Sequence, residues 1–374
     1  MARVFYNWSF VPYSAYAMCG LLVGYVYYHK RDSLTVTATL KPLFGEKVGR
    51  PACSAVIDTL SMLALTIGLT TGLTMCITLV MAGLKSAYGM QETIPLFIIL
   101  GVIIIFCFTF STTSPRQGLK IVGNFNAWFY YGLLALLLVT GPTLFIARMG
   151  TAGVGEWLTN FWRWGLDPID VGGPALTRAW TLWDFCFMIG YAPVTGIFLA
   201  ILSYGRTVRE YLIVNWVLPA VFGIIWFAIW GASAIDMQIN GTADLVGAIK
   251  TGGAVMALWE FLKNLLWPRR GRHSYKYSGN TRLVHHLRRR DARQHRLDVC
   301  ARRSDRHRAA REDKGPLGRH GRSDSDSHGA YGGGAQGIDG VKALASAAGF
   351  VVLFIYAIQA VAYVKVFFVD KVDE

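Results

Sequence analysis

Seven long apolar runs are the feature that most limits how this chain can fold. An α-helix needs about 20 apolar residues to cross the hydrocarbon core of a bilayer. The chain is 53% hydrophobic, above the roughly 45–50% that is usual for soluble domains. We therefore expect an all-α membrane protein. The expected crossings are residues 10–28, 55–83, 94–110, 125–146, 176–202, 208–235 and 343–368.

Two further segments mix apolar and charged residues and are expected to lie along the membrane surface. The first, "GTAGVGEWLTNFWRWGLD" (residues 150–167), is rich in aromatic residues, as interfacial amphipathic helices are. The second, residues 243–266, contains Lys250, Glu260 and Lys263, and an additional crossing is the alternative for it. Lys and Arg in the short loops place residues 30–50 on the cytoplasmic side.

The segment "AWTLWDFCFMIGYAPVTG" (residues 179–196) carries an aromatic stripe with one carboxylate. At 100° per residue, five side chains fall within an arc of about 100°. They are Trp180, Asp184, Phe187, Met188 and Tyr191. Aromatic faces attract quaternary ammonium groups, and an ionisable residue inside a crossing is usually functional. We predict a cation pocket here, with helix packing as the alternative. Gly190, Pro193 and Gly196 predict local unwinding of this helix.

Two other patterns add candidate ligands. "NWSFVPYSAY" (residues 7–16) places Trp8, Tyr13 and Tyr16 within about 140° of one helix, although interfacial anchoring also explains such residues. "LTIGLTTGLT" (residues 65–74) places Thr66 and Thr70 on one face, where hydroxyl oxygens suit a hard cation such as sodium. Hydrogen bonds to the helix's own carbonyl groups are the alternative for both threonines.

These segments together resemble the betaine/choline/carnitine transporter (BCCT) family. The resemblance rests on "WTLWDFCFMIGYAPVTGIFLAILSYGRTVREY" (residues 180–211), with "KPLFGEK", "GPTLFI" and "WFAIWG" at the expected places. It implies a sodium-symporter-type inverted repeat of five plus five helices, here partial, commonly in a homotrimer. It also implies transport of small quaternary amines, with sodium, a proton or exchange supplying the coupling.

The resemblance implies roles for particular residues. Trp8, Tyr13 and Tyr16 match a first set of aromatic box residues. The second set is Phe185, Phe187, Met188 and Tyr191. Thr66 and Thr70 match threonines of a sodium site. Asp184 replaces a usual tyrosine, and we expect it to supply counter-charge to an ammonium group or to take a proton.

A basic segment separates residues 1–267, the expected transporter core, from the last crossing in 333–374. Residues 268–330 hold 18 Lys and Arg against 7 Asp and Glu, a net +11 of the chain's +14, and 16 of the 18 are Arg. The similar family members have two crossings here, and about three more before the place where this chain begins. In a GC-rich gene, many codons for apolar residues encode Arg, His or Leu when the reading frame is shifted one base earlier. We therefore predict that residues 268–332 are out of frame and that residues 288–308 pack poorly.

The basic segment also has two alternative interpretations. A solvated disordered loop or a nucleic-acid-binding tract would be basic as well, but the absence of aromatic residues between 283 and 330 disfavours the latter. We expect no nucleic-acid partner, no metal, no resident cofactor and no enzymatic activity. The predicted partners are the bilayer of the inner (plasma) membrane and a small quaternary amine. The alternative function is an inactive multi-pass protein with an interaction or regulatory role.

Overall fold

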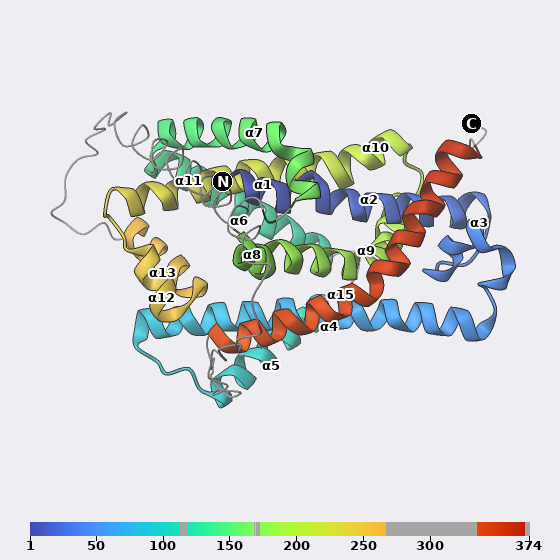
Figure 1. Cartoon of the computed structure of the whole chain (residues 1–374). Helices are drawn as coiled ribbons and strands as arrows, with labels where there is room; N and C mark the ends of the chain where they lie inside the picture. Colours follow the sequence, from blue (N-terminus) through green and yellow to red (C-terminus); the bar gives the residue numbers. More distant parts are fainter. Residues whose placement is uncertain (113–117, 168, 170–172, 267–334, 371–374) are drawn as a thin grey trace, which may run out of the picture. The chain divides into compact units, whose positions relative to one another are not determined.

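The computed structural model describes residues 1–112, 118–167, 169, 173–266 and 335–370 (Figure 1). These residues form α-helices, short 3-10 turns and π-helical segments, with no strand among them, so the predicted all-α fold is confirmed. The elements are α1 (Ala2–Trp8), α2 (Phe10–Gly24), η1 (Tyr25–His29), η2 (Thr37–Leu40), α3 (Lys41–Phe44), η3 (Gly45–Lys47), α4 (Pro51–Tyr88), α5 (Ile94–Thr112), α6 (Gly118–Thr140), α7 (Thr143–Leu166), α8 (Gly173–Leu176), η4 (Thr177–Leu182), α9 (Trp183–Leu202), α10 (Val208–Leu212), η5 (Ile213–Val217), α11 (Leu218–Ile239), α12 (Leu245–Gly252), α13 (Ala254–Leu266), α15 (Ala335–Val364) and η6 (Lys365–Val369).

Six helical stretches of the described chain are long and apolar enough to cross a membrane. They are Ala2–His29, Pro51–Tyr88, Lys120–Thr140, Thr177–Leu202, Val208–Ile239 and Lys342–Val369. Each overlaps one predicted crossing. A seventh apolar helix, Ile94–Cys107, is shorter than the others. The first crossing begins before residue 10, because α1 continues the apolar run with only a local break at Ser9.

The predicted crossing 125–146 is wrong at its carboxyl end. The structure ends α6 at Thr140 and begins α7 at Thr143, so the two helices are separated by Gly141 and Pro142. Proline has no N–H to donate and its ring clashes with the carbonyl group four residues earlier, which stops a helix there. Residue Ile146 therefore belongs to the first turns of α7, a 24-residue helix whose amphipathic sequence was predicted to be interfacial.

The predicted unwinding at Gly190, Pro193 and Gly196 is also wrong. Helix α9 runs through all three residues, with Pro193 inside it. The glycines serve helix packing instead. A side chain at Gly196 would meet the backbone of Gly20 on α2, and one at Gly190 would meet Gly349 on α15 at 3.5 Å. The irregular part of this crossing lies before α9, in the π-helical segment η4.

Residues 243–266 form two short helices, α12 and α13, which are separated by Gly253 with φ +78°. Glycine adopts positive φ at no steric cost, and here it breaks the segment into pieces too short to cross a bilayer. The structure thus disfavours the alternative of an additional crossing. The prediction for residues 288–308 falls outside the described residues.

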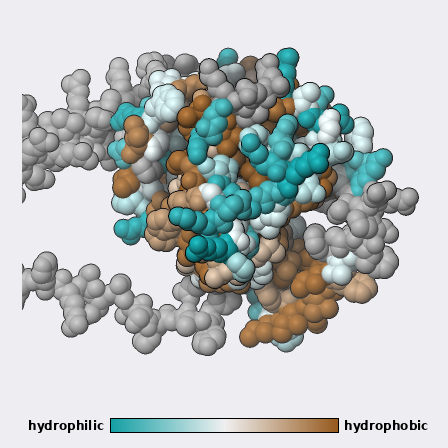
Figure 2. Space-filling view, turned by 90° about the vertical axis from the view of Figure 1, so that its right-hand side faces the viewer, coloured by the Kyte–Doolittle hydropathy of each residue, from teal (hydrophilic) through white to brown (hydrophobic). Residues whose placement is uncertain are grey.

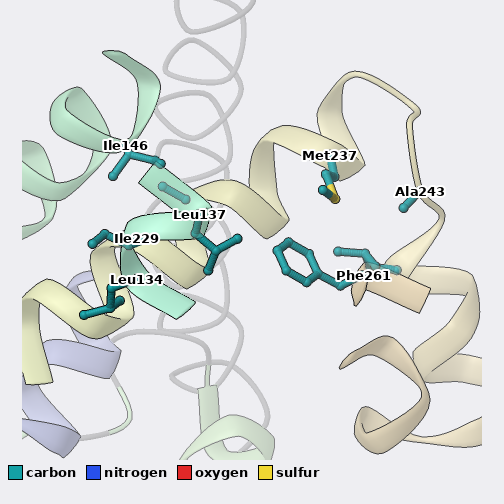
Figure 3. Packing of buried hydrophobic residues seen from close by; sticks show 9 residues of the cluster. Leu134, Leu137, Ile146, Ile229, Met237, Ala243 and Phe261 are labelled. Carbon is teal, nitrogen blue, oxygen red and sulfur yellow. The ribbon is translucent and has the colours of Figure 1, made fainter. Parts of the chain in front are cut away.

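A buried apolar cluster joins five of these helices, α6, α7, α11, α12 and α13. Leu134 and Leu137 of α6 pack with Ile229 and Met237 of α11, and Phe261 of α13 points toward them (Figure 3). Outside such clusters, α4, α5 and α6 expose many Val, Ile, Leu and Phe side chains, as expected of surfaces that face lipid. Hydrophilic side chains gather on the face where α3 and η6 lie (Figure 2).

Helix α9 lies between α2, α4 and α15, and glycines bring its neighbours close (Figure 1). A Cβ added at Gly68 of α4 would lie 2.5 Å from the ring of Tyr191. A Cβ added at Gly349 of α15 would lie 2.9 Å from Cα of Cys186. Small residues let helix backbones approach closely in membranes. These contacts fix the register of α4 and α15 along α9.

Candidate cation-binding site

A polar ladder links α1 with the start of the α9 crossing. Asn7 donates a hydrogen bond from Nδ2 to Oδ2 of Asp184 at 3.0 Å, and Arg3 donates from Nη2 to Oγ1 of Thr181 at 3.3 Å. Arg3 and Asn7 are four residues apart, and Thr181 and Asp184 three apart, so each pair shares a helix face. The ladder therefore holds the Asp184 side chain in a fixed orientation against α1.

Asp184 is a buried carboxylate whose hydrogen bonding is incomplete. It is only 1% exposed, and its Oδ1 atom has no hydrogen-bond partner among the described residues. The side chain of Trp8 approaches the carboxylate, and the ammonium group of Lys342 on α15 interacts with it electrostatically. Removing a carboxylate from water costs free energy unless partners compensate. The geometry thus provides a negative group suited to a cation.

An aromatic group lies one turn further along α9. The Tyr16 hydroxyl donates to the sulfur atom of Met188 at 2.8 Å, and the rings of Tyr13 and Tyr16 meet edge-on at 6.4 Å. The ring of Phe187 lies 4.8 Å from that of Tyr191, and Tyr191 is close enough to Tyr16 to interact with its hydroxyl. The structure therefore brings together five predicted site residues from α2 and α9.

Aromatic rings also form a continuous row along α9 and η4. The ring centroids of Trp180 and Trp183 are 6.3 Å apart, those of Trp183 and Phe187 5.2 Å, and those of Phe187 and Tyr191 4.8 Å. The spacings of three, four and four residues keep all four side chains on one side of the helix. This row ends beside the group that contains Tyr16.

The structure places the other predicted site residues elsewhere. Phe185 packs against Tyr6 at 6.2 Å, within the apolar cluster of α1 and α7. Trp8 faces Phe227 at 6.2 Å and Asp184, rather than Tyr13 and Tyr16. Thr66 and Thr70 are exposed on α4 and donate to the carbonyl oxygens of Met62 and Thr66. They lie about 160° around α4 from Gly68, which contacts Tyr191.

Four site residues were missed from the sequence. Arg3, Asn7 and Lys342 are polar or charged residues on helices that reach Asp184 or its neighbours, and Trp183 adjoins Asp184 in the chain. The i,i+4 spacing of Arg3 and Asn7 at the edge of an apolar run was the available signal. Nothing local in the sequence marks Lys342, since its role depends on how α15 packs on α9.

A separate cavity of about 690 Å³ lies at the end of the helices where η1, α3 and η6 meet. Its lining includes Tyr25, His29, Asp32 and Lys41. Lys41 forms an ion pair with Asp32 at 2.7 Å. Burial would raise the pKa of the Asp32 carboxyl group, but hydrogen bonds from Lys41 and Ser33 hold that pKa below its ordinary value. None of the predicted site residues lines this cavity.

The fold defines a multi-pass α-helical membrane protein, and one of its crossings carries a buried carboxylate and a row of aromatic rings. Comparison with known proteins makes the class specific. Residues 1–270 match the BCCT family, the betaine/carnitine/choline family transporters, and the chain belongs to this family. Members of the family are multi-pass inner-membrane transporters and not enzymes, which agrees with the six apolar helices.

Several curated relatives carry informative names. The chain is 31% identical over 244 residues to a glycine betaine transporter of Bacillus subtilis, covering 64% of this chain and 48% of that protein. It is 26% identical over 266 residues to an ectoine/hydroxyectoine transporter of Virgibacillus pantothenticus, covering 71% and 52%. It is 25% identical over 245 residues to the high-affinity choline transport protein of Escherichia coli, covering 65% and 36%. The chain thus spans about half the length, or less, of these relatives.

Proposed function

We propose that this chain serves secondary active transport of small quaternary ammonium compounds, such as glycine betaine, choline or carnitine. The observation that carries the proposal is the buried Asp184 carboxylate, which lies one helical turn before Met188 on α9, where Tyr16, Phe187 and Tyr191 gather. Ring faces attract a trimethylammonium group without hydrogen bonds, and the carboxylate balances its charge. The names of the relatives agree with this chemistry.

Binding of choline and glycine betaine to the purified chain tests the proposal. We expect saturable binding by isothermal titration calorimetry in detergent. Tyr191→Leu should weaken it about twofold to thirtyfold, since a cation–π contact contributes roughly 0.5–2 kcal/mol. Tyr191→Phe keeps the ring and should keep the affinity.

Tyr88→Leu provides a matched control for Tyr191→Leu, because Tyr88 is 77% exposed at the end of α4. It should leave binding unchanged. Absence of saturable binding by the unmodified chain, or equal affinities for Tyr191→Leu and Tyr88→Leu, would contradict the proposal. A loss of binding in Tyr191→Phe as large as in Tyr191→Leu would argue that the phenol hydroxyl, not the ring, is required.

We further propose sodium as the coupling ion, with Thr66 and Thr70 as candidate ligands, and assembly as a homotrimer. A threonine hydroxyl that donates to its own helix keeps its oxygen lone pairs available to a cation, which supports the first idea. The trimer rests on the family resemblance. The other function considered, an inactive protein with a regulatory role, is not favoured, because the matched relatives are named as transporters.

A further inference from the structure

The cavity of about 690 Å³ where η1, α3 and η6 meet separates a positive group from a negative one. Its lining includes Lys30, which follows η1, and Asp370, which follows η6. Among the described residues, neither forms an ion pair with any other residue or with the other of the two. The ammonium group of Lys30 lies 5.7 Å from the ring centroid of Tyr25 instead.

The other lysine in the lining is already neutralised. Lys41 lies 2.7 Å from the carboxylate of Asp32 and 3.2 Å from that of Glu46. These three side chains form one wall of the cavity and hold each other in place. The charges that remain for a ligand are therefore those of Lys30 and Asp370, and a molecule that carries one positive and one negative group complements them.

The backbone around the cavity is irregular. Arg31 has a φ of +53°, which is uncommon for a residue other than glycine, and both of its neighbours, Lys30 and Asp32, line the cavity. The two crossings that end here do so in the π-helical turns η1 and η6. Such turns are rare and are frequent at functional sites. The local backbone thus agrees with a binding site rather than a gap in packing.

The cavity lies at the level of the lipid headgroups. The crossings Ala2–His29 and Lys342–Val369 have 28 residues each, so each is about 42 Å long, close to the roughly 40–45 Å thickness of a bilayer with its headgroups. Both end at this cavity, on the side of the molecule where α3 lies (Figure 1). Phe368 and Val369 of η6 are 69% and 68% exposed, and they offer apolar surface to acyl chains.

We propose that this cavity binds the headgroup of a zwitterionic phospholipid, phosphatidylethanolamine. Its phosphate faces Lys30 and its primary ammonium group faces Asp370, beside the stacked rings of Tyr25 and His29. A primary ammonium has three N–H donors for a carboxylate, whereas the trimethylammonium group of phosphatidylcholine has none. Phosphatidylglycerol carries the phosphate without a cation to balance Asp370. The proposal goes beyond the proposed function, because none of the transport-site residues lines this cavity.

Native mass spectrometry of the purified, delipidated full chain tests this site. Phosphatidylethanolamine should bind about tenfold more tightly than phosphatidylcholine or phosphatidylglycerol with the same acyl chains, because only it makes charge-assisted hydrogen bonds at both ends. Lys30→Gln should weaken binding of the ethanolamine and glycerol lipids alike. Asp370→Asn should weaken binding of the ethanolamine lipid but strengthen binding of the glycerol lipid, since it removes a repulsion. A folding defect would weaken both, so a fall in both affinities would overturn the role of Asp370.

Lys47→Gln and Asp244→Asn are matched controls, because both residues are exposed and neither lines the cavity. They should leave the three lipid affinities unchanged. Equal affinities of the unmodified chain for the three lipids would overturn the proposal, as would equal effects of Lys30→Gln and Lys47→Gln. Glycerophosphoethanolamine has the same headgroup without acyl chains. Binding of this soluble compound without binding of the lipid would show that the bilayer is not the source of the ligand.

Discussion

Replacing Asp184 by asparagine should weaken choline binding by roughly tenfold to a hundredfold. Hydrogen bonds and contacts to a charged group contribute about 1.5–3 kcal/mol, and Asp184 is the buried carboxylate beside the aromatic group. Asparagine has almost the same shape and can still accept the hydrogen bond that Asn7 donates to Oδ2. The variant therefore removes charge with little change in packing. Titration calorimetry with the purified chain measures the difference.

The choice of ligand sharpens the experiment on Asp184. Choline carries a single positive charge, whereas glycine betaine carries its own carboxylate. If Asp184 supplies the counter-charge, Asp184→Asn should reduce choline affinity more than glycine betaine affinity. Equal losses for both ligands would indicate a positional effect of the side chain. Unchanged affinity together with unchanged ion dependence would contradict a functional role for Asp184.

Asp244→Asn is the matched control for this substitution. Asp244 is exposed and caps α12 by accepting a hydrogen bond from the backbone N–H of Gly247. Asparagine caps helices about as well as aspartate, so this variant should fold normally. It removes one negative charge from the protein without touching the candidate site. Its ligand affinities should match those of the unmodified chain, which separates a local effect at Asp184 from a change in net charge.

Most of the helices could be predicted from the sequence because apolar length is a direct requirement of the bilayer. The errors have local physical causes. The Gly141–Pro142 pair ends α6, and an apolar run alone does not show this. Conversely, Pro193 was expected to disturb α9 but lies inside a continuous helix. A hydropathy pattern reports which residues prefer lipid, and the backbone chemistry of glycine and proline decides where each helix stops.

The candidate site could be predicted only in part. Helical period placed Asp184, Met188 and Tyr191 on nearby faces of one helix, and the structure sets them beside Asn7 and Tyr16. The helical periodicity of one segment does not show, however, which other helices pack against it. The contacts of Lys342 and Asn7 with this helix join residues far apart in the sequence. They depend on close helix crossings that involve single glycines.

Gly349→Leu should lower the apparent melting temperature of the purified protein by roughly 3–10 °C. Overpacking a tight contact costs about 1–3 kcal/mol, and a cost of 1 kcal/mol shifts the midpoint by roughly 2–4 °C at this size. The added side chain would meet the backbone of Cys186 on α9, which cannot move aside as a flexible side chain could. Thermal unfolding in one detergent, followed by circular dichroism, measures the shift.

Gly340→Leu on the same helix is the control for this prediction. A Cβ at Gly340 has no atom within 4 Å among the described residues, so its melting temperature should change little. Similar destabilisation by both variants would contradict the prediction, because leucine has a higher intrinsic helix propensity than glycine and Gly340 has no such tight contact.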